Sequence, residues 1–183
     1  MTTRIGINGF GRIGRTYLRA ALAGGADVEV VAVNDLTDAG TLATLLEWDS
    51  VNGHFGGVAV EDDGLRVADR VIKVFSEPEP ARIPWGEVGA DVVIEATGFF
   101  TDREKAAEHL RGGARKVIVS APPKGDVPTF VLGVNDDRLD VSAADVFSNG
   151  SCTTNSLAPL AKVLNDVVGI ETGLMTTVHA YTG

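Results

Sequence analysis

The sequence has a single cysteine, Cys152, in 183 residues. One cysteine excludes an internal disulfide framework and fits a reducing compartment, so we expect a cytoplasmic protein. No apolar run approaches the roughly 18 residues that a membrane-spanning helix requires. The N-terminus enters a strand pattern at once and shows no secretory signal. These absences predict a globular protein without a membrane partner.

Basic residues are outnumbered, because 16 Lys and Arg stand against 25 Asp and Glu and give a formal net charge of −9 with His neutral. Nucleic acids are bound by basic faces, so we expect no nucleic-acid partner. The three histidines, His54, His109 and His179, show no metal-ligand spacing with the cysteine, and no metal site is predicted. The length suits one domain and part of a second, and a 44% share of hydrophobic residues allows a sizeable core.

A glycine-rich turn lies between a predicted strand at 4–8 and a predicted helix at 15–23, which Gly24-Gly25 ends. The turn has the spacing G-x-G-x-x-G. A buried strand at 28–33 follows and ends in Asn34-Asp35, so Asp35 comes 35 − 14 = 21 positions after the last glycine of the turn. Together these features form the complete dinucleotide-binding fingerprint. A glycine turn beside a solvated aspartate is the weaker alternative.

The residues of the turn have distinct expected roles. Gly9 permits the tight turn, Gly11 lets the backbone approach a pyrophosphate, and Gly14 allows the helix to pack closely on the strand. The pyrophosphate is expected near the first N–H groups of the helix, at Arg12 and Ile13.

Asp35 and the ends of later strands complete the expected cofactor site. The Asp35 carboxylate accepts hydrogen bonds from ribose hydroxyls and repels a 2′-phosphate, which favours NAD over NADP. Strands predicted at 91–96 and 116–119 are followed by Thr97, Gly98 and Ser120. Strand ends in an open parallel sheet face the ligand crevice, so these residues are candidates to line the cofactor, although each also suits a simple turn.

The remaining elements are assigned from apolar periodicity and turn residues. We expect helices at 39–48 and from 101 or 102 to about 111, and strands at 58–60, 65–67, 71–75, 130–134 and 174–178. The alternation of strands and helices predicts an α/β fold, a Rossmann dinucleotide-binding domain with a mostly parallel sheet.

The only cysteine stands where a strand turns into a helix. Val146-Phe147 is strand-like, Ser151 and the threonines after Cys152 are typical of a helix start, and apolar residues recur at helical spacing from Leu157 to Val168. Unpaired N–H groups and the helix dipole favour an anion at such a position, so we expect a lowered pKa for the Cys152 thiol. A buried, inert cysteine is the alternative.

His179 follows the predicted strand at 174–178 and is the candidate base and thiolate partner of Cys152. A lone histidine is more often structural, and a cysteine–histidine pair also fits a protease or an acyltransferase. The dinucleotide fingerprint decides between these alternatives, because a nucleophilic thiol beside a nicotinamide indicates oxidation of an aldehyde through a thioester.

Further motifs run in order along essentially the whole chain: Ile7–Arg15, Asn34-Asp35, Asp49–Gly53, Glu95–Phe99, Ser120–Pro122, Ser148–Asn155 and Thr176–Thr182. Together they resemble the phosphorylating glyceraldehyde-3-phosphate dehydrogenase family. The resemblance implies a Rossmann domain at 1–150, followed at 151–183 by the start of an α+β catalytic domain. It also implies a homotetramer that uses NAD, glyceraldehyde 3-phosphate and inorganic phosphate.

The resemblance also implies roles for single residues. Cys152 attacks the aldehyde carbon to give a thiohemiacetal, His179 holds the thiolate and takes the hydroxyl proton, and phosphate attacks the thioester to give 1,3-bisphosphoglycerate. Ser151, Thr153 and Thr182 match positions that bind phosphate groups. The NAD-contacting positions of the family are matched by Arg12, Ile13, Asp35, Ser120 and the backbone of Pro78.

Three departures from the family accompany the resemblance. Gly150 stands where alanine is usual, Pro78 stands where a basic residue is common, and the family runs to about twice this length. We therefore expect the chain to be one piece of a complete enzyme, whose phosphate-binding arginine and nicotinamide-orienting asparagine lie beyond it. An erythrose-4-phosphate dehydrogenase and a non-catalytic NAD-binding fragment remain alternatives, and a glycolytic or gluconeogenic direction is left open.

Overall fold

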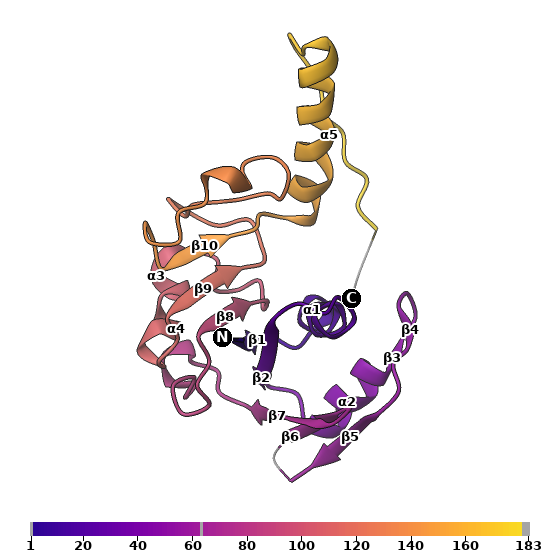
Figure 1. The fold of residues 1–183 in the computed structure, drawn as a ribbon, viewed down its shortest axis with the longest axis vertical. Helices are drawn as coiled ribbons and strands as arrows, with labels where there is room; N and C mark the ends of the chain where they lie inside the picture. Colours follow the sequence, from indigo (N-terminus) through magenta and orange to yellow (C-terminus); the bar gives the residue numbers. More distant parts are fainter. Residues whose placement is uncertain (1, 63, 181–183) are drawn as a thin grey trace.

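The computed structural model describes residues 2–62 and 64–180. Its main element is an eight-stranded sheet with the order β10-β9-β8-β1-β2-β7-β6-β5 (Figure 1). The strands of this sheet are β1 (Thr3–Asn8), β2 (Val28–Asn34), β5 (Val58–Glu61), β6 (Gly64–Val67), β7 (Arg70–Phe75), β8 (Val92–Glu95), β9 (Lys116–Val119) and β10 (Val146–Ser148). The helices are α1 (Arg12–Ala23), α2 (Ala39–Glu47), α3 (Arg103–Ala106), α4 (Glu108–Arg111) and α5 (Cys152–Val168), with 3₁₀ turns η1 (Pro80–Arg82) and η2 (Asp136–Arg138).

The sheet is mostly parallel, which confirms the predicted fold class. Neighbouring strands from β10 to β7 pair in parallel, and only β6 and β5 are antiparallel. The chain leaves β1 towards β2 on one side and later returns to β8 on the other side. The carboxyl ends of these parallel strands therefore meet at one edge, and the strand order reverses between β1 and β8.

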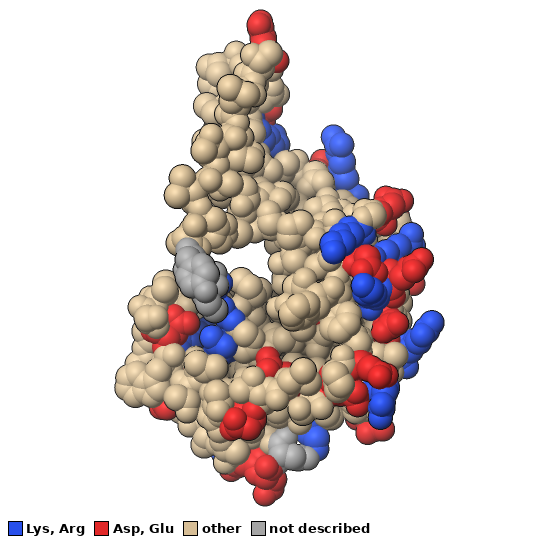
Figure 2. All heavy atoms as spheres, turned by 180° about the vertical axis from the view of Figure 1, so that it is seen from behind, with Lys and Arg blue, Asp and Glu red and all other residues tan. Residues whose placement is uncertain are grey.

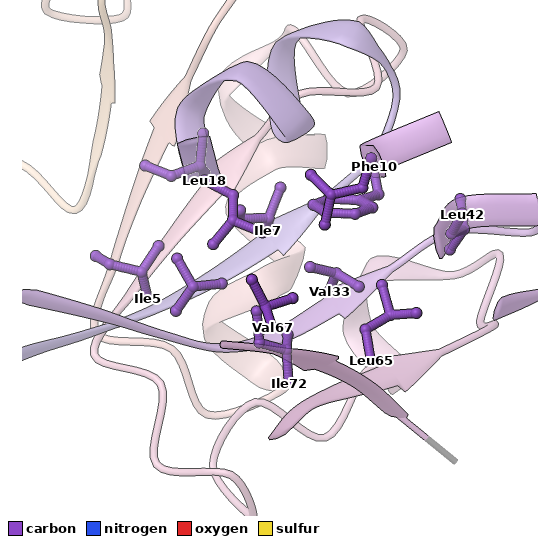
Figure 3. Close-up of a cluster of buried hydrophobic side chains, with 12 residues drawn as sticks. Ile5, Ile7, Phe10, Leu18, Val33, Leu42, Leu65, Val67 and Ile72 are labelled. Carbon is purple, nitrogen blue, oxygen red and sulfur yellow. The ribbon is translucent and has the colours of Figure 1, made fainter. Parts of the chain in front are cut away.

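Both faces of the sheet are covered, as continuous apolar strands require. On one face, side chains from β1, β2, β6 and β7 pack with Phe10, Leu18 of α1 and Leu42 of α2 (Figure 3). On the other face, the fully buried Trp85 and Ile83 pack against Ala32 of β2 and Val93 of β8. A third cluster joins Ala106 of α3 to β9 and β10.

Helix α1 begins at Arg12, three positions before the predicted start at residue 15. Gly14 therefore belongs to the first turn of the helix. Gly14 is buried, and a Cβ there would lie 2.3 Å from the carbonyl oxygen of Gly9. The end of the helix is as predicted, since Gly24 caps it and Gly25 adopts a φ of +61°.

The helix predicted from 101 or 102 to about 111 is wrong as a single element. Asp102 caps α3 by accepting a hydrogen bond from the backbone of Lys105, but α3 ends at Ala106 and α4 begins at Glu108. Beyond the break, His109 lies fully buried, where it bonds to Trp85 and Glu95.

The strands predicted at 130–134 and 174–178 are also wrong. Thr129 makes only a single bridge to Ser148, and the Asn135 side chain then accepts the Val131 N–H and turns the chain. In the second segment Leu174 and Val178 are almost fully exposed and pair with no strand of the described chain. Between α2 and β5 the chain forms a short hairpin of β3 (Trp48–Asp49) and β4 (Gly53–His54).

Helix α5 projects away from the sheet, and the segment after it runs back towards α1 (Figure 1). Its apolar residues, from Leu157 to Val168, are exposed rather than packed. The projection carries few charged side chains, whereas Lys, Arg, Asp and Glu are dense on the sheet-bearing part (Figure 2). In the described part of the chain, no helix is both long enough and apolar enough to cross a membrane.

The close contact at Gly14 gives a test of the fold. Gly14→Ala places a methyl group against the Gly9 carbonyl, so we expect the free energy of unfolding to fall by about 1–3 kcal/mol. Gly173→Ala is the control, because a Cβ at Gly173 meets no atom within 4 Å. Urea unfolding followed by tryptophan fluorescence measures both variants, and an unchanged midpoint for Gly14→Ala would contradict the packing.

Candidate active site

A cleft of about 350 Å³ opens at the carboxyl edge of the sheet, at the ends of the paired strands β1 and β8. The predicted cofactor residues Gly9, Gly11, Asp35, Pro78 and Thr97 line this cleft. They come from four different connections of the chain, so the fold brings together residues up to 88 positions apart (97 − 9). Exposed Leu36 and Phe99 add apolar walls suited to a flat ring.

The glycine turn is shaped for an anionic group. Gly9 has a φ of +88°, and a Cβ there would lie 2.7 Å from the Thr97 nitrogen. Gly11, the N-cap of α1, faces open space with no atom within 4 Å of its ideal Cβ position. The first N–H groups of α1 have no partner within the helix. A phosphate group can therefore approach the backbone at exposed Arg12 and Ile13.

Asp35 is half-buried at the end of β2 and is held by backbone groups. One carboxylate oxygen accepts the N–H of Phe10 at 2.8 Å, and the other accepts the N–H of Thr37 at 3.0 Å. An ionised carboxylate offers about four acceptor positions, so capacity remains for hydroxyl donors in the cleft.

The other predicted cofactor residues lie beside the cleft or in its walls. Gly98 is exposed with a φ of +76°, next to the cleft residue Thr97. Ser120 follows β9, and its Oγ donates to the Glu95 carbonyl at 3.0 Å. Pro78 is exposed and contributes to the cleft after β7.

Cys152 is the first residue of α5, and the local sequence explains its position. Gly150 adopts a φ of +73° after β10, which reverses the chain. Ser151 is the N-cap, and its Oγ accepts the N–H of Thr154 at 2.9 Å. The turn places the Cys152 thiol at the positive end of the α5 dipole.

His179 approaches Cys152 from the segment after α5. The Cys152 Sγ and the His179 Nε2 are 3.3 Å apart, and His179 Nδ1 lies 2.9 Å from the Ala180 carbonyl oxygen. Because that carbonyl only accepts, Nδ1 carries a proton and Nε2 faces the sulfur. Both side chains are exposed and line a groove of about 290 Å³ with Thr153, so they are accessible to a small molecule.

The contact moves the two pKa values in opposite directions. The hydrogen bond with His179 lowers the pKa of the Cys152 thiol, and hydrogen bonds with Thr153 act in the same direction. The hydrogen bond with Cys152 raises the pKa of His179, as does the bond to Ala180. These shifts favour a thiolate next to an imidazolium, the reactive form of a nucleophilic cysteine. The positive charge of Arg12 opposes the rise in the pKa of His179.

The candidate phosphate-binding residues are only partly described. Thr153 lies in the groove beside Cys152, and Ser151 is half-buried with its Oγ 2.8 Å from Thr154 Oγ1. Thr182 lies outside the described residues. Among residues 2–62 and 64–180, no three side chains of His, Cys, Asp or Glu gather in a way that could hold a metal ion.

A set of buried polar residues beneath the cleft was not predicted from the sequence. Asn8, Asn34 and Glu95 are buried, each is the last residue of a parallel strand, and Glu95 contacts the buried His109. Their positions at strand ends were the available signal, because such residues face the ligand edge of a parallel sheet.

The parallel sheet, the glycine turn at its switch point and the cleft beside Asp35 define a dinucleotide-binding Rossmann domain. Sequence comparison agrees: the family description "Glyceraldehyde 3-phosphate dehydrogenase, NAD binding domain" matches residues 3–103, and the corresponding "C-terminal domain" matches residues 151–183. The chain belongs to the glyceraldehyde 3-phosphate dehydrogenase family.

Curated relatives match over all 183 residues. The chain is 57% identical to glyceraldehyde-3-phosphate dehydrogenase 1 of Streptomyces avermitilis and covers 55% of it. It is 56% identical both to glyceraldehyde-3-phosphate dehydrogenase 1 of Bacillus subtilis and to the Geobacillus stearothermophilus enzyme, covering 54% of each. The chain thus spans about half the length of the curated relatives it matches.

Alkylation rates test the cysteine–histidine contact. Because the pKa of Cys152 is lowered, we expect iodoacetamide to modify it faster at neutral pH than the same thiol in urea-denatured protein. His179→Ala removes the largest cause of the lowered pKa, so its rate should fall several-fold at neutral pH and should rise only at higher pH.

His54→Ala is the matched control, because His54 is exposed and contacts Glu47 instead. Mass spectrometry of Cys152 modification across a pH series gives the rates. Equal rates for wild type and His179→Ala throughout the series would contradict the contact.

Proposed function

We propose that the protein to which this chain belongs oxidises and phosphorylates glyceraldehyde 3-phosphate to 1,3-bisphosphoglycerate with NAD. The observation that carries the proposal is the 3.3 Å contact between Cys152 and His179 at a helix N-terminus. It occurs in a chain whose Rossmann domain matches the family's NAD-binding domain. The relatives' names support the same activity.

The residues of the cleft suit NAD. The open backbone at Gly11 and the first turn of α1 would hold the pyrophosphate, and Asp35 would accept hydrogen bonds from the ribose hydroxyls. Gly9 and Gly14 shape the turn. The rest of the proposed cofactor site is bordered by Thr97, Gly98, Ser120 and the Pro78 backbone. When bound, NAD supplies a nicotinamide ring that accepts a hydride.

The chemistry of the chain's own residues begins with the Cys152 thiolate. Its sulfur attacks the aldehyde carbon, a carbon–sulfur bond forms, and the carbonyl oxygen takes the proton of the His179 imidazolium. The product is a thiohemiacetal on Cys152. The neutral His179 Nε2 then takes back the hydroxyl proton as the carbon gives up its hydride, which leaves a thioester.

Phosphate completes the reaction. An oxygen of inorganic phosphate attacks the thioester carbon, the carbon–sulfur bond breaks, and Cys152 departs as a thiolate that the imidazolium of His179 stabilises again. Thr153 lines the groove with Cys152, and Ser151 precedes Cys152 as the N-cap of α5. We propose that their hydroxyl groups bind phosphate oxygens, with Thr182 as the third proposed ligand. We expect the Cys152 N–H at the start of α5 to stabilise the oxyanion.

The proposal divides the chain at residue 150. Residues 1–150 form the NAD-binding domain, and residues 151–183 begin a catalytic domain, with which the match to the C-terminal domain from residue 151 agrees. The exposed apolar residues of α5 support a further part of that domain packing against them. A cytoplasmic homotetramer completes the proposal, on the strength of the resemblance to the family.

NADH formation by the intact polypeptide, as the cell makes it, tests the proposed function. We expect absorbance at the NADH band to rise with glyceraldehyde 3-phosphate only when NAD and phosphate are both present. Cys152→Ser should abolish turnover, and His179→Asn should lower kcat by about 100- to 10,000-fold through loss of acid–base catalysis.

Two outcomes would contradict the proposal. Faster, phosphate-independent turnover of erythrose 4-phosphate would favour the related four-carbon dehydrogenase. Tight NAD binding without turnover of either aldehyde would favour a non-catalytic NAD-binding protein.

Asp35 gives a separate test of cofactor choice. Asp35→Asn removes the negative charge that favours ribose hydroxyls and repels a 2′-phosphate, so NAD should bind about tenfold more weakly. NADP should bind more tightly than it does to wild type. Asp27→Asn removes an equal charge at the start of β2, where Asp27 bonds Thr2, and should change neither affinity. Isothermal titration calorimetry measures the affinities of the wild type and both variants for NAD and for NADP, and an unchanged NAD-to-NADP ratio in Asp35→Asn would exclude this role.

A further inference from the structure

A buried carboxylate lies directly beneath the cofactor cleft. Glu95, the last residue of β8, is only 1% exposed. One of its carboxylate oxygens accepts the N–H of Thr97 at 2.8 Å and also the Thr97 hydroxyl. The other accepts the side-chain amide of Asn8 at 2.6 Å and lies 2.9 Å from His109 Nε2. Thr97, Asn8 and His109 therefore surround both oxygens of this carboxylate.

Trp85 fixes the orientation of the His109 ring beside the Glu95 carboxylate. Trp85 Nε1 donates to His109 Nδ1 at 3.0 Å, and an indole nitrogen can only donate. Nδ1 is therefore an acceptor without a proton, so the proton of the ring is at Nε2 and points to Glu95. Both His109 and Trp85 are 0% exposed, which holds the ring in this orientation.

The same network reaches the walls of the cleft. Asn8 Oδ1 accepts the Asn34 side-chain amide at 2.8 Å. Asn34 then bonds the backbone of Glu77 twice, donating to its carbonyl at 2.9 Å and accepting its N–H at 2.8 Å. Asn8, Asn34, Glu77 and Thr97 all line the cleft. The ends of β1, β2 and β8 and the segment after β7 are thus joined through hydrogen bonds to one carboxylate.

The free-energy cost of burying the Glu95 carboxylate depends on how many hydrogen-bond donors contact its oxygens. A buried carboxylate is costly unless donors satisfy its oxygens, and removing one partner leaves a penalty that the surroundings must relieve by moving. Without the His109 donor, Thr97 and Asn8 are the remaining partners of Glu95. A rearrangement around the carboxylate therefore displaces residues that line the cleft. None of the chemical steps at Cys152 uses Glu95, His109 or Trp85.

We propose that His109, oriented by Trp85, is a positioning residue of the cofactor cleft. Its Nε2–H completes the donors of Glu95, which in turn holds Thr97 and Asn8 in the arrangement that binds the dinucleotide. This role rests on the proposed binding of NAD in the same cleft. A purely structural histidine would be replaced equally well by any side chain that fills its volume, whereas a positioning histidine requires a donor at this point.

Two substitutions of similar size separate these roles in the intact polypeptide. His109→Gln keeps an N–H donor within reach of Glu95, and His109→Leu fills the space without one. We expect His109→Leu to bind NAD about tenfold more weakly than wild type, and His109→Gln to stay within about threefold. At saturating NAD the kcat of His109→Leu should stay close to that of wild type, so the loss appears in the KM for NAD.

Val67→Ala is the control for stability, because Val67 lies in the core cluster of β6 and takes no part in the network. It should lower the urea midpoint without changing the NAD affinity measured by calorimetry. Equal affinities for His109→Leu and wild type would overturn the proposal, as would equal losses in the Leu and Gln variants.

Nitrogen NMR of the ¹⁵N-histidine-labelled protein tests the orientation without any substitution at His109. We expect Nε2 of His109 to show a bonded proton and Nδ1 to show none, and Trp85→Phe to alter the Nδ1 signal. A proton on Nδ1 would overturn the proposal. If wild-type protein failed to bind NAD, the proposed function would fall together with the positioning role. Normal NAD binding by His109→Leu would overturn the positioning role alone.

Discussion

The parallel pairing of β1 with both β2 and β8 is the constraint on which the site depends. Parallel strands end at the same edge, and the reversal of strand order beside β1 leaves that edge open to a ligand. Residues at the strand ends, including Asn8, Asn34 and Glu95, therefore meet beneath one cleft although they are far apart in the sequence. The cleft and its polar floor derive from this pairing.

The same local structure, a glycine with positive φ followed by a helix N-terminus, occurs twice at this edge. After β1, Gly9 takes a φ of +88° and α1 begins at Arg12; after β10, Gly150 takes a φ of +73° and α5 begins at Cys152. In both places a glycine reverses the backbone and presents the positive end of a helix. The first helix N-terminus suits a phosphate group, and the second suits a thiolate. Cofactor binding and nucleophile activation thus rely on the same physical interaction.

Local patterns were sufficient for much of this site. The glycine spacing, Asp35 and the capped start of α5 could be predicted because each depends on a few neighbouring residues. The burial of His109 against Trp85 and Glu95 could not, since these contacts join residues that are distant in the sequence. The segment 174–178 looked like a strand from its apolar residues, but a strand also needs a neighbour to pair with. The 3.3 Å approach of His179 to Cys152 likewise spans 27 positions and is visible only in three dimensions.

We propose that the dinucleotide cleft and the Cys152–His179 pair form a single active site. A crystal structure of the intact protein with NAD bound tests this arrangement most directly. We expect the pyrophosphate at the first turn of α1, the adenosine ribose at Asp35, and the nicotinamide ring in van der Waals contact with the Cys152 sulfur. NAD bound away from α1, or a nicotinamide separated from that sulfur by other protein groups, would contradict it.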